Sequence, residues 1–179
     1  AGQDLGEATD PNGPELTQIV QEHYNPIIRK IRGIEKPVVA AVNGVAAGAG
    51  ASISICCDIV VATESASFIQ AFSKIGLIPD SAGTFFLPRL VGLQKATALM
   101  MTAESVSSKD AEEMGMIYKV FPDDKFVEES WKLASKLAKM PTKGLGLTKQ
   151  LLNASYSNNL EQQLEMEDKY QTIAGNSSD

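Results

Sequence analysis

One stretch rich in small residues limits what this chain can fold into more than any other feature. Residues 36–52 read Lys-Pro-Val-Val-Ala-Ala-Val-Asn-Gly-Val-Ala-Ala-Gly-Ala-Gly-Ala-Ser. The apolar, partly β-branched run at 38–42 predicts a fully buried strand, and Asn43-Gly44 predicts a turn. The following residues, 46–51, carry no side chain larger than a methyl group. We expect the strand to turn abruptly into a helix whose backbone another group can approach closely.

The start of such a helix can stabilise negative charge. Its first N–H groups have no acceptor inside the helix, and they lie at the positive end of the helix dipole. They therefore suit a developing oxyanion. The alternative left open by these residues is that they only allow tight packing of helix on sheet. The glycines at 44, 48 and 50 do not follow the G-x-G-x-x-G spacing, and no Gly-Lys-Ser/Thr follows, which disfavours a phosphate-binding loop.

The rest of the first half continues a strand–helix–strand pattern. The apolar run at 59–62 predicts a second buried strand, and the short spacing predicts that it lies parallel to strand 38–42 in a βαβ unit. Residues 15–34 have a helical period. Pro26 predicts a kink or break in that helix, and Gly33 predicts its end.

The second half is mostly helical. Its pattern predicts one strand at 116–121 and helices at 92–103, 107–115, 124–140, 142–155 and 160–174. We therefore expect an α/β core at residues 1–122, which would carry the functional site, and a helical region at 123–179.

The charge pattern excludes several partners. The net charge is −6, and charges of both signs are scattered along the chain. This argues against nucleic acid or an anionic membrane surface as a partner. No apolar run is long enough to span a bilayer.

Histidine and cysteine are scarce. His23 is the only histidine and lies among helix formers, which argues against a Ser-His-Asp triad. Cys56 and Cys57 are adjacent in an apolar run and are the only cysteines. We expect reduced core thiols in a cytoplasmic protein, and no metal site, since two thiols supply too few ligands.

A second informative stretch is Gly76-Leu-Ile-Pro-Asp-Ser-Ala-Gly-Thr84. Pro79 keeps Ile78 extended, because the residue before proline avoids the helical region. Asp80 then has two interpretations. It stands where the N-cap of a following helix would stand, or it is an acid/base group.

Several motifs, in this order, resemble those of the enoyl-CoA hydratase/isomerase (crotonase) superfamily, and the resemblance covers nearly the whole chain. They are Ala1-Gly-Gln-Asp-Leu5, residues 36–50, Cys57-Asp-Ile-Val60, Gly76–Thr84 and Leu87-Pro-Arg-Leu-Val-Gly92. Within the superfamily, Gln70-Ala-Phe-Ser-Lys74 and Gly144-Leu-Gly-Leu147 are most similar to the isomerases of phenylacetate degradation.

The resemblance implies a fold and an assembly. The fold is a crotonase-like spiral of ββα units with a C-terminal helical region. Family chains begin with a β-rich segment ahead of the Ala-Gly motif, so we expect the N-terminal strands to be missing from this chain. The family assembles as trimers, often paired into hexamers, and a homo-oligomer formed through the helical region is expected here.

The resemblance also implies a site. Family members bind an acyl-CoA thioester and hold its carbonyl oxygen with two backbone N–H groups, which by motif are those of Gln3 and Ala49. Coenzyme A is part of the substrate, so no resident cofactor is expected. Further residues placed by motif along the substrate and CoA path are Ala1, Gly2, Asp4, Gly48, Ser52, Phe72 and Pro79.

Two departures from the hydratases of the family decide the expected reaction. Those enzymes use two glutamates around a water molecule, and the corresponding positions here are Ser52 and Phe72. Neither side chain can act as a general base. In isomerases and dehalogenases of the superfamily, a carboxylate near the position of Asp80 does the chemistry.

We therefore expect an acyl-CoA isomerase with Asp80 as the acid/base. Its substrate would be a ring-epoxidised phenylacetyl-CoA or a 3-enoyl-CoA. Desolvation by apolar neighbours would raise the pKa of Asp80; the neighbours expected to do so are Ile69, Phe72 and Ile75. Two alternatives remain: an enoyl-CoA hydratase with an unusual base, and a non-catalytic acyl-CoA-binding paralogue.

Overall fold

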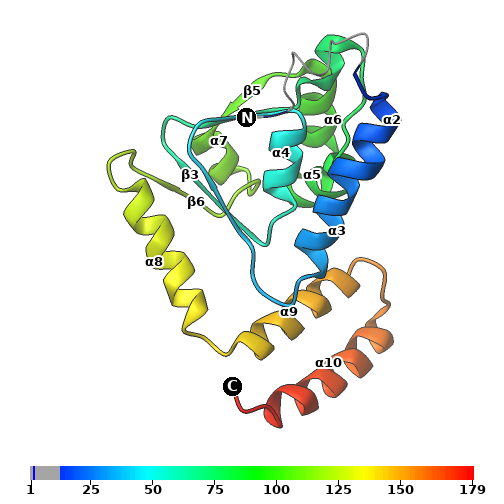
Figure 1. Ribbon diagram of the computed structural model, residues 1–179, viewed down its shortest axis with the longest axis vertical. Helices are drawn as coiled ribbons and strands as arrows, with labels where there is room; N and C mark the ends of the chain where they lie inside the picture. The colour runs from blue at the N-terminus through cyan, green and yellow to red at the C-terminus, as the bar shows by residue number, and fades with distance from the viewer. Residues whose placement is uncertain (1, 3–12) are drawn as a thin grey trace.

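The computed structural model describes Gly2 and residues 13–179. Figure 1 shows an α/β body with helix α8 at its left and helices α9 and α10 below it. Within the described ranges, no helix combines the length and the hydropathy that crossing a bilayer would need.

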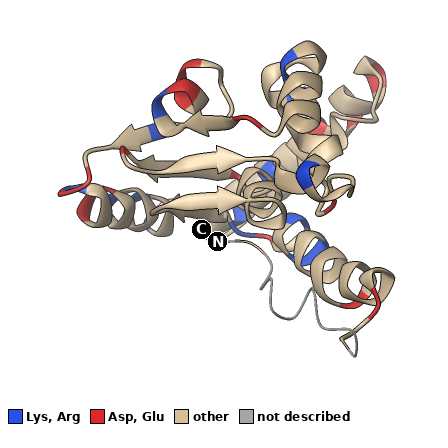
Figure 2. Ribbon diagram, turned by 90° about the horizontal axis from the view of Figure 1, so that it is seen from above, with Lys and Arg blue, Asp and Glu red and all other residues tan. Residues whose placement is uncertain are grey.

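The described strands form two small sheets. The first is parallel and has the order β1-β3-β6: β1 (Val39–Val42), β3 (Ile59–Thr63) and β6 (Lys119–Phe121). In the second sheet, β4 pairs with a parallel strand on one side and an antiparallel one on the other: β2 (Val45–Ala47), β4 (Ser67–Ile69) and β5 (Ser105–Ser107). Lys119 is the only charged residue in these strands, and charges of both signs lie over the helices (Figure 2).

The helices cover both sheets and extend beyond them. They are α2 (Leu16–Gln18), the π-helix η1 (Ile19–Tyr24), α3 (Asn25–Gly33), α4 (Ala49–Ile55), the 3₁₀-helix η2 (Ala71–Ile75), α5 (Gly83–Val91), α6 (Leu93–Thr102), α7 (Ser108–Glu113), α8 (Phe126–Ala138), α9 (Thr142–Ala154) and α10 (Leu160–Gly175).

The βαβ unit predicted around the small-residue stretch is present. Strands β1 and β3 pair in parallel, with Val39 opposite Ile59, and α4 lies between them in the chain. The strand was expected to be fully buried, and this is wrong: β1 is half-buried, with Ala41 exposed. The reason is its position, because among the described strands β1 has a neighbour on one side only.

The predicted direct passage from strand to helix is also wrong. The extra strand β2 lies between them, and α4 begins only at Ala49. The N–H of Gly48 donates to the carbonyl of Ile69 at 2.9 Å, which continues the pairing of β2 with β4. Residues 45–48 therefore belong to the second sheet rather than to the first turn of the helix.

The break predicted at Pro26 takes the form of a change in helix type. The π-helix η1 ends at Tyr24, and α3 begins at Asn25 with Pro26 in its first turn. Because η1 runs directly into α3, the N–H of Asn25 still donates to the carbonyl of Val20, five residues back. Pro26 has no N–H and cannot continue this pattern, and the bonding changes type at this point. α3 ends at Gly33 as predicted.

Most of the core lies between the sheets and helices α4 to α7. Its largest fully buried side chains include Phe68 and Leu87. A second, smaller cluster of Val61, Phe121 and Phe126 attaches α8 to strands β3 and β6.

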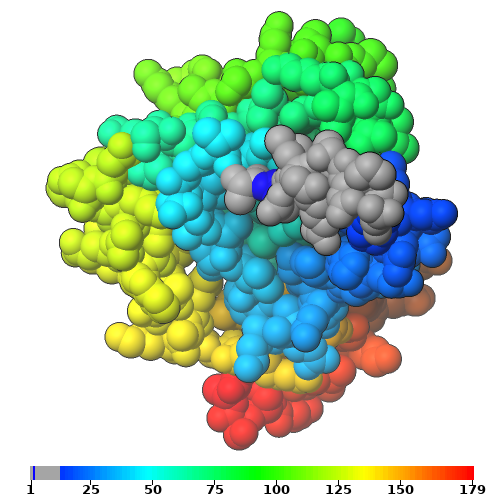
Figure 3. Space-filling view, turned by 45° about the horizontal axis from the view of Figure 1, so that its top comes forward, coloured from blue at the N-terminus to red at the C-terminus, as the bar shows by residue number. Residues whose placement is uncertain are grey.

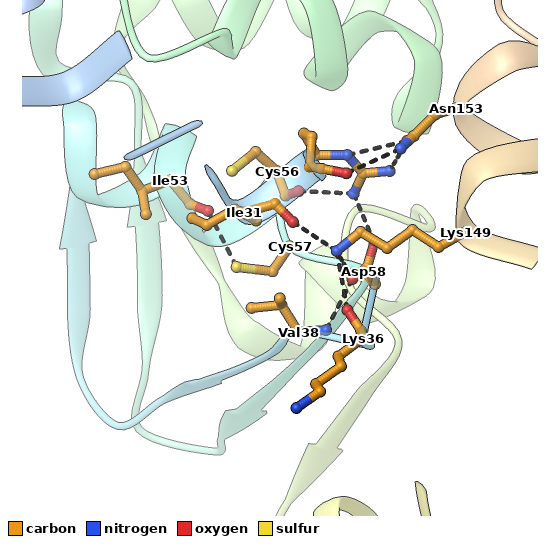
Figure 4. Close-up of polar contacts among 10 residues, drawn as sticks. Ile31, Lys36, Val38, Ile53, Cys56, Cys57, Asp58, Lys149 and Asn153 are labelled. Atoms are coloured by element: carbon orange, nitrogen blue, oxygen red, sulfur yellow. Dashed lines mark hydrogen bonds and ion pairs between the residues drawn. The ribbon is translucent and has the colours of Figure 1, made fainter. Parts of the chain in front are cut away.

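A buried polar cluster attaches α9 to the body (Figure 4). The Nζ of Lys149, a residue that is only 5% exposed, lies 2.7 Å from the Oδ2 of Asp58 and donates to the carbonyls of Ile31 (2.5 Å) and Lys36 (3.1 Å). Arg32 of α3 donates to the Oδ1 of Asp58 at 2.9 Å. This cluster fixes α9 against α3 and the segment before β3.

The same arginine joins the cluster to two further elements. Arg32 donates to the carbonyl of Cys56 at 2.9 Å, at the C-terminal end of α4. It also donates to the side chain of Asn153 in α9. The two cysteines beside it are free thiols, with Cys56 buried and Cys57 partly buried.

Candidate active site

The start of α4 has the backbone geometry expected of an oxyanion site. Gly48 precedes the helix with φ +52° and ψ −120°, a conformation that residues with a Cβ rarely adopt. Ala49, which is buried, is the first residue of the helix, so its N–H belongs to the first turn, where backbone donors lack an intrahelical acceptor. The structure places Ala49 at the start of the helix, and its role as an oxyanion donor stays a prediction.

Gly2 lies beside this helix start. A Cβ built on Gly2 would come within 2.6 Å of the carbonyl oxygen of Ala47, so the two backbones pass very close to each other. Figure 3 shows the face of the molecule on which the β1–β2 region lies. The other predicted residues of this motif, Ala1, Gln3 and Asp4, lie outside the described residues, and the role of Gln3 as second donor stays a prediction.

By the resemblance, two positions would carry the glutamates of a hydratase; one lies in α4 and the other beside its start. Ser52 is one turn after Ala49 and is fully buried. Phe72 of η2 is 6% exposed, and its ring would lie 3.7 Å from a Cβ placed on Gly48. A hydroxyl and an aromatic ring therefore take the place of a carboxylate pair.

Helix α5 approaches α4 closely through a glycine. A Cβ on Gly83 would come within 2.5 Å of the Oγ of Ser52, so no larger residue fits there without movement. Gly83 is also bonded to the motif that contains Asp80, because its N–H donates to the Asp80 carbonyl at 2.9 Å. The start of α5 therefore links Ser52 to Asp80.

The interpretation of Asp80 as a helix N-cap is wrong. α5 begins at Gly83, its N-cap is Ala82, and no side chain caps it. Ser81 and Ala82 both have left-handed backbones, with φ +51° and +60°. These two residues lie between Asp80 and the helix, so the carboxylate has no capping bond with α5. Such conformations cost free energy for residues with a Cβ and are often found at functional sites.

The carboxyl of Asp80 is half-buried beside Pro79, and this burial raises its pKa above the usual range for aspartate. The expected direction of the shift is confirmed. Ile75 was expected to contribute to this desolvation, but its side chain is 66% exposed and shields the carboxyl little from water. A bond from the hydroxyl of Ser81 to Oδ1, at 2.9 Å, opposes the rise by stabilising the carboxylate.

Two residues of the site escaped sequence reasoning. Ser81 is 2% exposed and donates to Asp80. Gln70 is 3% exposed and faces Ser52, with its Oε1 3.5 Å from the Ser52 Oγ. The only local signal for Ser81 was that it is a polar residue directly after a candidate catalytic acid. The only local signal for Gln70 was that it is a polar residue directly after a buried strand.

No group of three or more His, Cys, Asp or Glu side chains comes together as a metal site in the described part of the chain. The chemistry of the site, as far as it is described, rests on one carboxyl, backbone donors and neutral polar groups.

Comparison with known proteins agrees with this geometry. The family described as enoyl-CoA hydratase/isomerase matches over residues 1–179. The chain is 47% identical over 182 aligned residues to the 1,2-epoxyphenylacetyl-CoA isomerase of Escherichia coli, covering all of this chain and 70% of that protein. It is 41% identical to a probable enoyl-CoA hydratase of Rhodobacter capsulatus, covering all of this chain and 69% of that protein.

Solved structures show the same arrangement. An enoyl-CoA hydratase from a Polaromonas species superimposes with a TM-score of 0.91 at 34% identity, over 99% of this chain and 70% of that one.

Proposed function

The chain belongs to the enoyl-CoA hydratase/isomerase family and has the crotonase fold, and from this premise we propose that it is an acyl-CoA isomerase with Asp80 as its acid/base. One observation carries the proposal. Asp80 is a half-buried carboxyl with a raised pKa and no capping role, in a site where Ser52 and Phe72 replace the glutamates of a hydratase.

The proposed reaction is a proton transfer through an enolate. The ionised carboxylate of Asp80 takes a proton from the carbon next to the thioester carbonyl. Negative charge then develops on the thioester oxygen, where the N–H of Ala49 and, by motif, that of Gln3 hold it. Each donor aimed at such an oxygen is typically worth about 3–4 kcal/mol of barrier. With a 3-enoyl-CoA, the electron pair of the broken C–H bond moves the double bond, and the Asp80 carboxyl returns the proton further along the chain.

The favoured substrate is a ring-epoxidised phenylacetyl-CoA, with a 3-enoyl-CoA as the second candidate. The similarity to the Escherichia coli isomerase supports this choice, and it would place the enzyme in phenylacetate degradation in the cytoplasm. With the epoxide, the same enolate is conjugated to the strained ring. The C–C bond shared by the epoxide and the six-membered ring breaks as the ring expands, and the Asp80 carboxyl returns the proton to a ring carbon. Coenzyme A is assigned to the substrate, and no resident cofactor is invoked.

The proposal includes a homo-oligomer, a trimer or a hexamer, formed through the helical region at 123–179. Several large apolar side chains of these helices are exposed, including Trp131 (69%), Leu152 (61%) and Leu160 (70%). Exposed apolar residues in such number are typical of surfaces that another chain covers.

The test is a direct comparison of two reactions. The purified protein should isomerise 3-hexenoyl-CoA or ring-epoxidised phenylacetyl-CoA at least a hundredfold faster than it adds water to crotonyl-CoA, because a hydratase needs a second carboxylate that is absent here. Two of the similar proteins are described as enoyl-CoA hydratases, and these descriptions favour the competing reaction, the addition of water. Comparable rates would support a hydratase, and tight thioester binding with no turnover would support a non-catalytic binding protein.

Loss of the Ser81 hydroxyl should change the pH dependence of this isomerase. The bond from Ser81 lowers the pKa of Asp80, so Ser81→Ala should raise that pKa further. Since the base must be ionised, the acidic limb of the kcat/KM profile should move to higher pH. The matched control is Ser135→Ala on the exposed face of α8, which should leave the profile in place. An unmoved profile in Ser81→Ala would show that Asp80 is not the titrating base.

A further inference from the structure

Gln70 lies between the elements that carry the proposed chemistry. It directly follows β4 and precedes η2. Its neighbours are Ser52, one turn after the oxyanion donor Ala49, and the start of α5, which is bonded to Asp80. With 3% of its surface exposed, its carboxamide belongs to the interior.

The two ends of this carboxamide have different surroundings. Its Oε1 accepts a long contact of 3.5 Å from the Ser52 hydroxyl and lies 3.6 Å from the Cβ position of Gly83. Its Nε2 is buried and has no hydrogen-bond partner in the described part of the chain. The amide therefore keeps a donor available.

An unused buried donor is expensive. Leaving such a group without an acceptor lowers the stability of the fold, and most buried side-chain polar atoms in proteins have a partner. A methionine would fill the same space without this cost. The presence of an amide here points to an acceptor that arrives with a ligand.

The position of the amide indicates which part of the ligand supplies that acceptor. The thioester oxygen is assigned to the start of α4, and the reacting carbons to Asp80. Gln70 contacts α4 through Ser52 and lies beside the start of α5 at Gly83, so it is close to both elements. Phe72, two residues on, supplies an apolar wall beside Gly48.

We propose that the Nε2 of Gln70 donates a hydrogen bond to an oxygen atom of the acyl group, which makes the site selective for oxygenated acyl-CoA thioesters over hydrocarbon ones. The inference rests on the proposed function, since it places the acyl group by the roles of Ala49 and Asp80. A site with a buried donor rejects a ligand that lacks the acceptor, because the donor is then left unpaired.

The experiment compares two thioesters that differ by one ring atom: (tetrahydropyran-2-yl)acetyl-CoA, which has a ring oxygen, and cyclohexylacetyl-CoA, which has CH₂ in its place. Calorimetry on the unmodified chain should give at least tenfold tighter binding of the ether. In Gln70→Met the two affinities should agree within about twofold. The control Gln94→Met, on an exposed position of α6, should keep the preference.

A thermal melt separates this role from a structural one. Gln70→Met should melt at the same temperature as the unmodified chain or higher, because it removes an unpaired buried donor. Gln70→Leu is the second variant, and it should lose the preference for the ether because its side chain has no hydrogen-bond donor. Equal affinities in the unmodified chain, or a preference kept in either variant, would overturn the inference.

The role of Gln70 and the proposed isomerase function would be overturned by different results. Isomerase turnover with equal binding of the two thioesters would overturn the role of Gln70 and leave the isomerase intact. Failure to bind either thioester would overturn both.

Discussion

Replacement of Asp80 by asparagine is expected to reduce isomerase turnover by about 10²–10⁴-fold, the usual contribution of a positioned acid/base. Asparagine keeps the shape of the side chain but has no proton to exchange with the acyl carbon. The oxyanion donors are backbone groups and remain, so the affinity for the thioester should change only a few fold. Turnover measured beside calorimetric binding of the same acyl-CoA checks both parts.

The same substitution should make the protein more stable at neutral pH. Burial raises the pKa of Asp80, so the folded chain holds this proton more tightly than the unfolded chain does. The ionised carboxylate therefore costs stability as the pH rises through the folded pKa, and that cost is absent below the pKa of unfolded aspartate. Asparagine carries no charge and avoids the cost.

Thermal melts at several pH values provide the check. The gain in Asp80→Asn should be largest at neutral pH and should shrink as the pH falls below the pKa of Asp80. Asp124→Asn, at an exposed position before α8, is the control and should show no such trend. A lower melting temperature for Asp80→Asn at neutral pH would instead mean that the carboxylate stabilises the fold.

Removal of the Asp58 carboxylate is expected to lower the free energy of unfolding by about 3–5 kcal/mol. Asp58 accepts from Arg32, Lys149 and the backbone N–H of Val38. In Asp58→Ala the ammonium of Lys149, which is 5% exposed, would lie in the interior without a counter-charge. Guanidinium unfolding measures the loss, which corresponds to a melting temperature lower by roughly 6–20 °C.

A double-mutant cycle tests whether the ion pair is the cause. Lys149→Met removes the buried charge and leaves Asp58 with Arg32 and Val38, so it should cost less than Asp58→Ala. Combining the two changes should recover part of the loss, because no unpaired ammonium remains. Additive losses would show that the two side chains stabilise the fold independently.

Much of the local structure follows from short patterns in the chain. The alternation of apolar and turn residues correctly predicts strands β1 and β3 and their parallel pairing, and the small-residue stretch correctly predicts a helix, which begins at Ala49. These features depend on residues that are close in sequence, so a window of some twenty residues contains the information. The absence of glutamate at Ser52 and Phe72 is likewise visible from the sequence, once the resemblance has given those positions their meaning.

The features that failed or escaped prediction depend on distant segments. β2 exists because it pairs with β4 some twenty residues later, and this pairing delays the start of α4. Asp80 is not a cap because Ser81 and Ala82, both with left-handed backbones, lie between it and the first residue of α5. The surroundings of the Gln70 amide are formed by Ser52 and Gly83, which come from two other elements.

The buried cluster at α9 shows the physical reason. Lys149 donates to Ile31, 118 residues away, and nothing in its own helix marks it as a buried cation. A lysine on a helix is normally solvated; its burial is favourable only after α3, the segment before β3, and α9 have come together and supplied a carboxylate and two carbonyls. Periodicity encodes the elements because they form through near neighbours, while the electrostatics of the site and of this cluster arise when the packed chain excludes water.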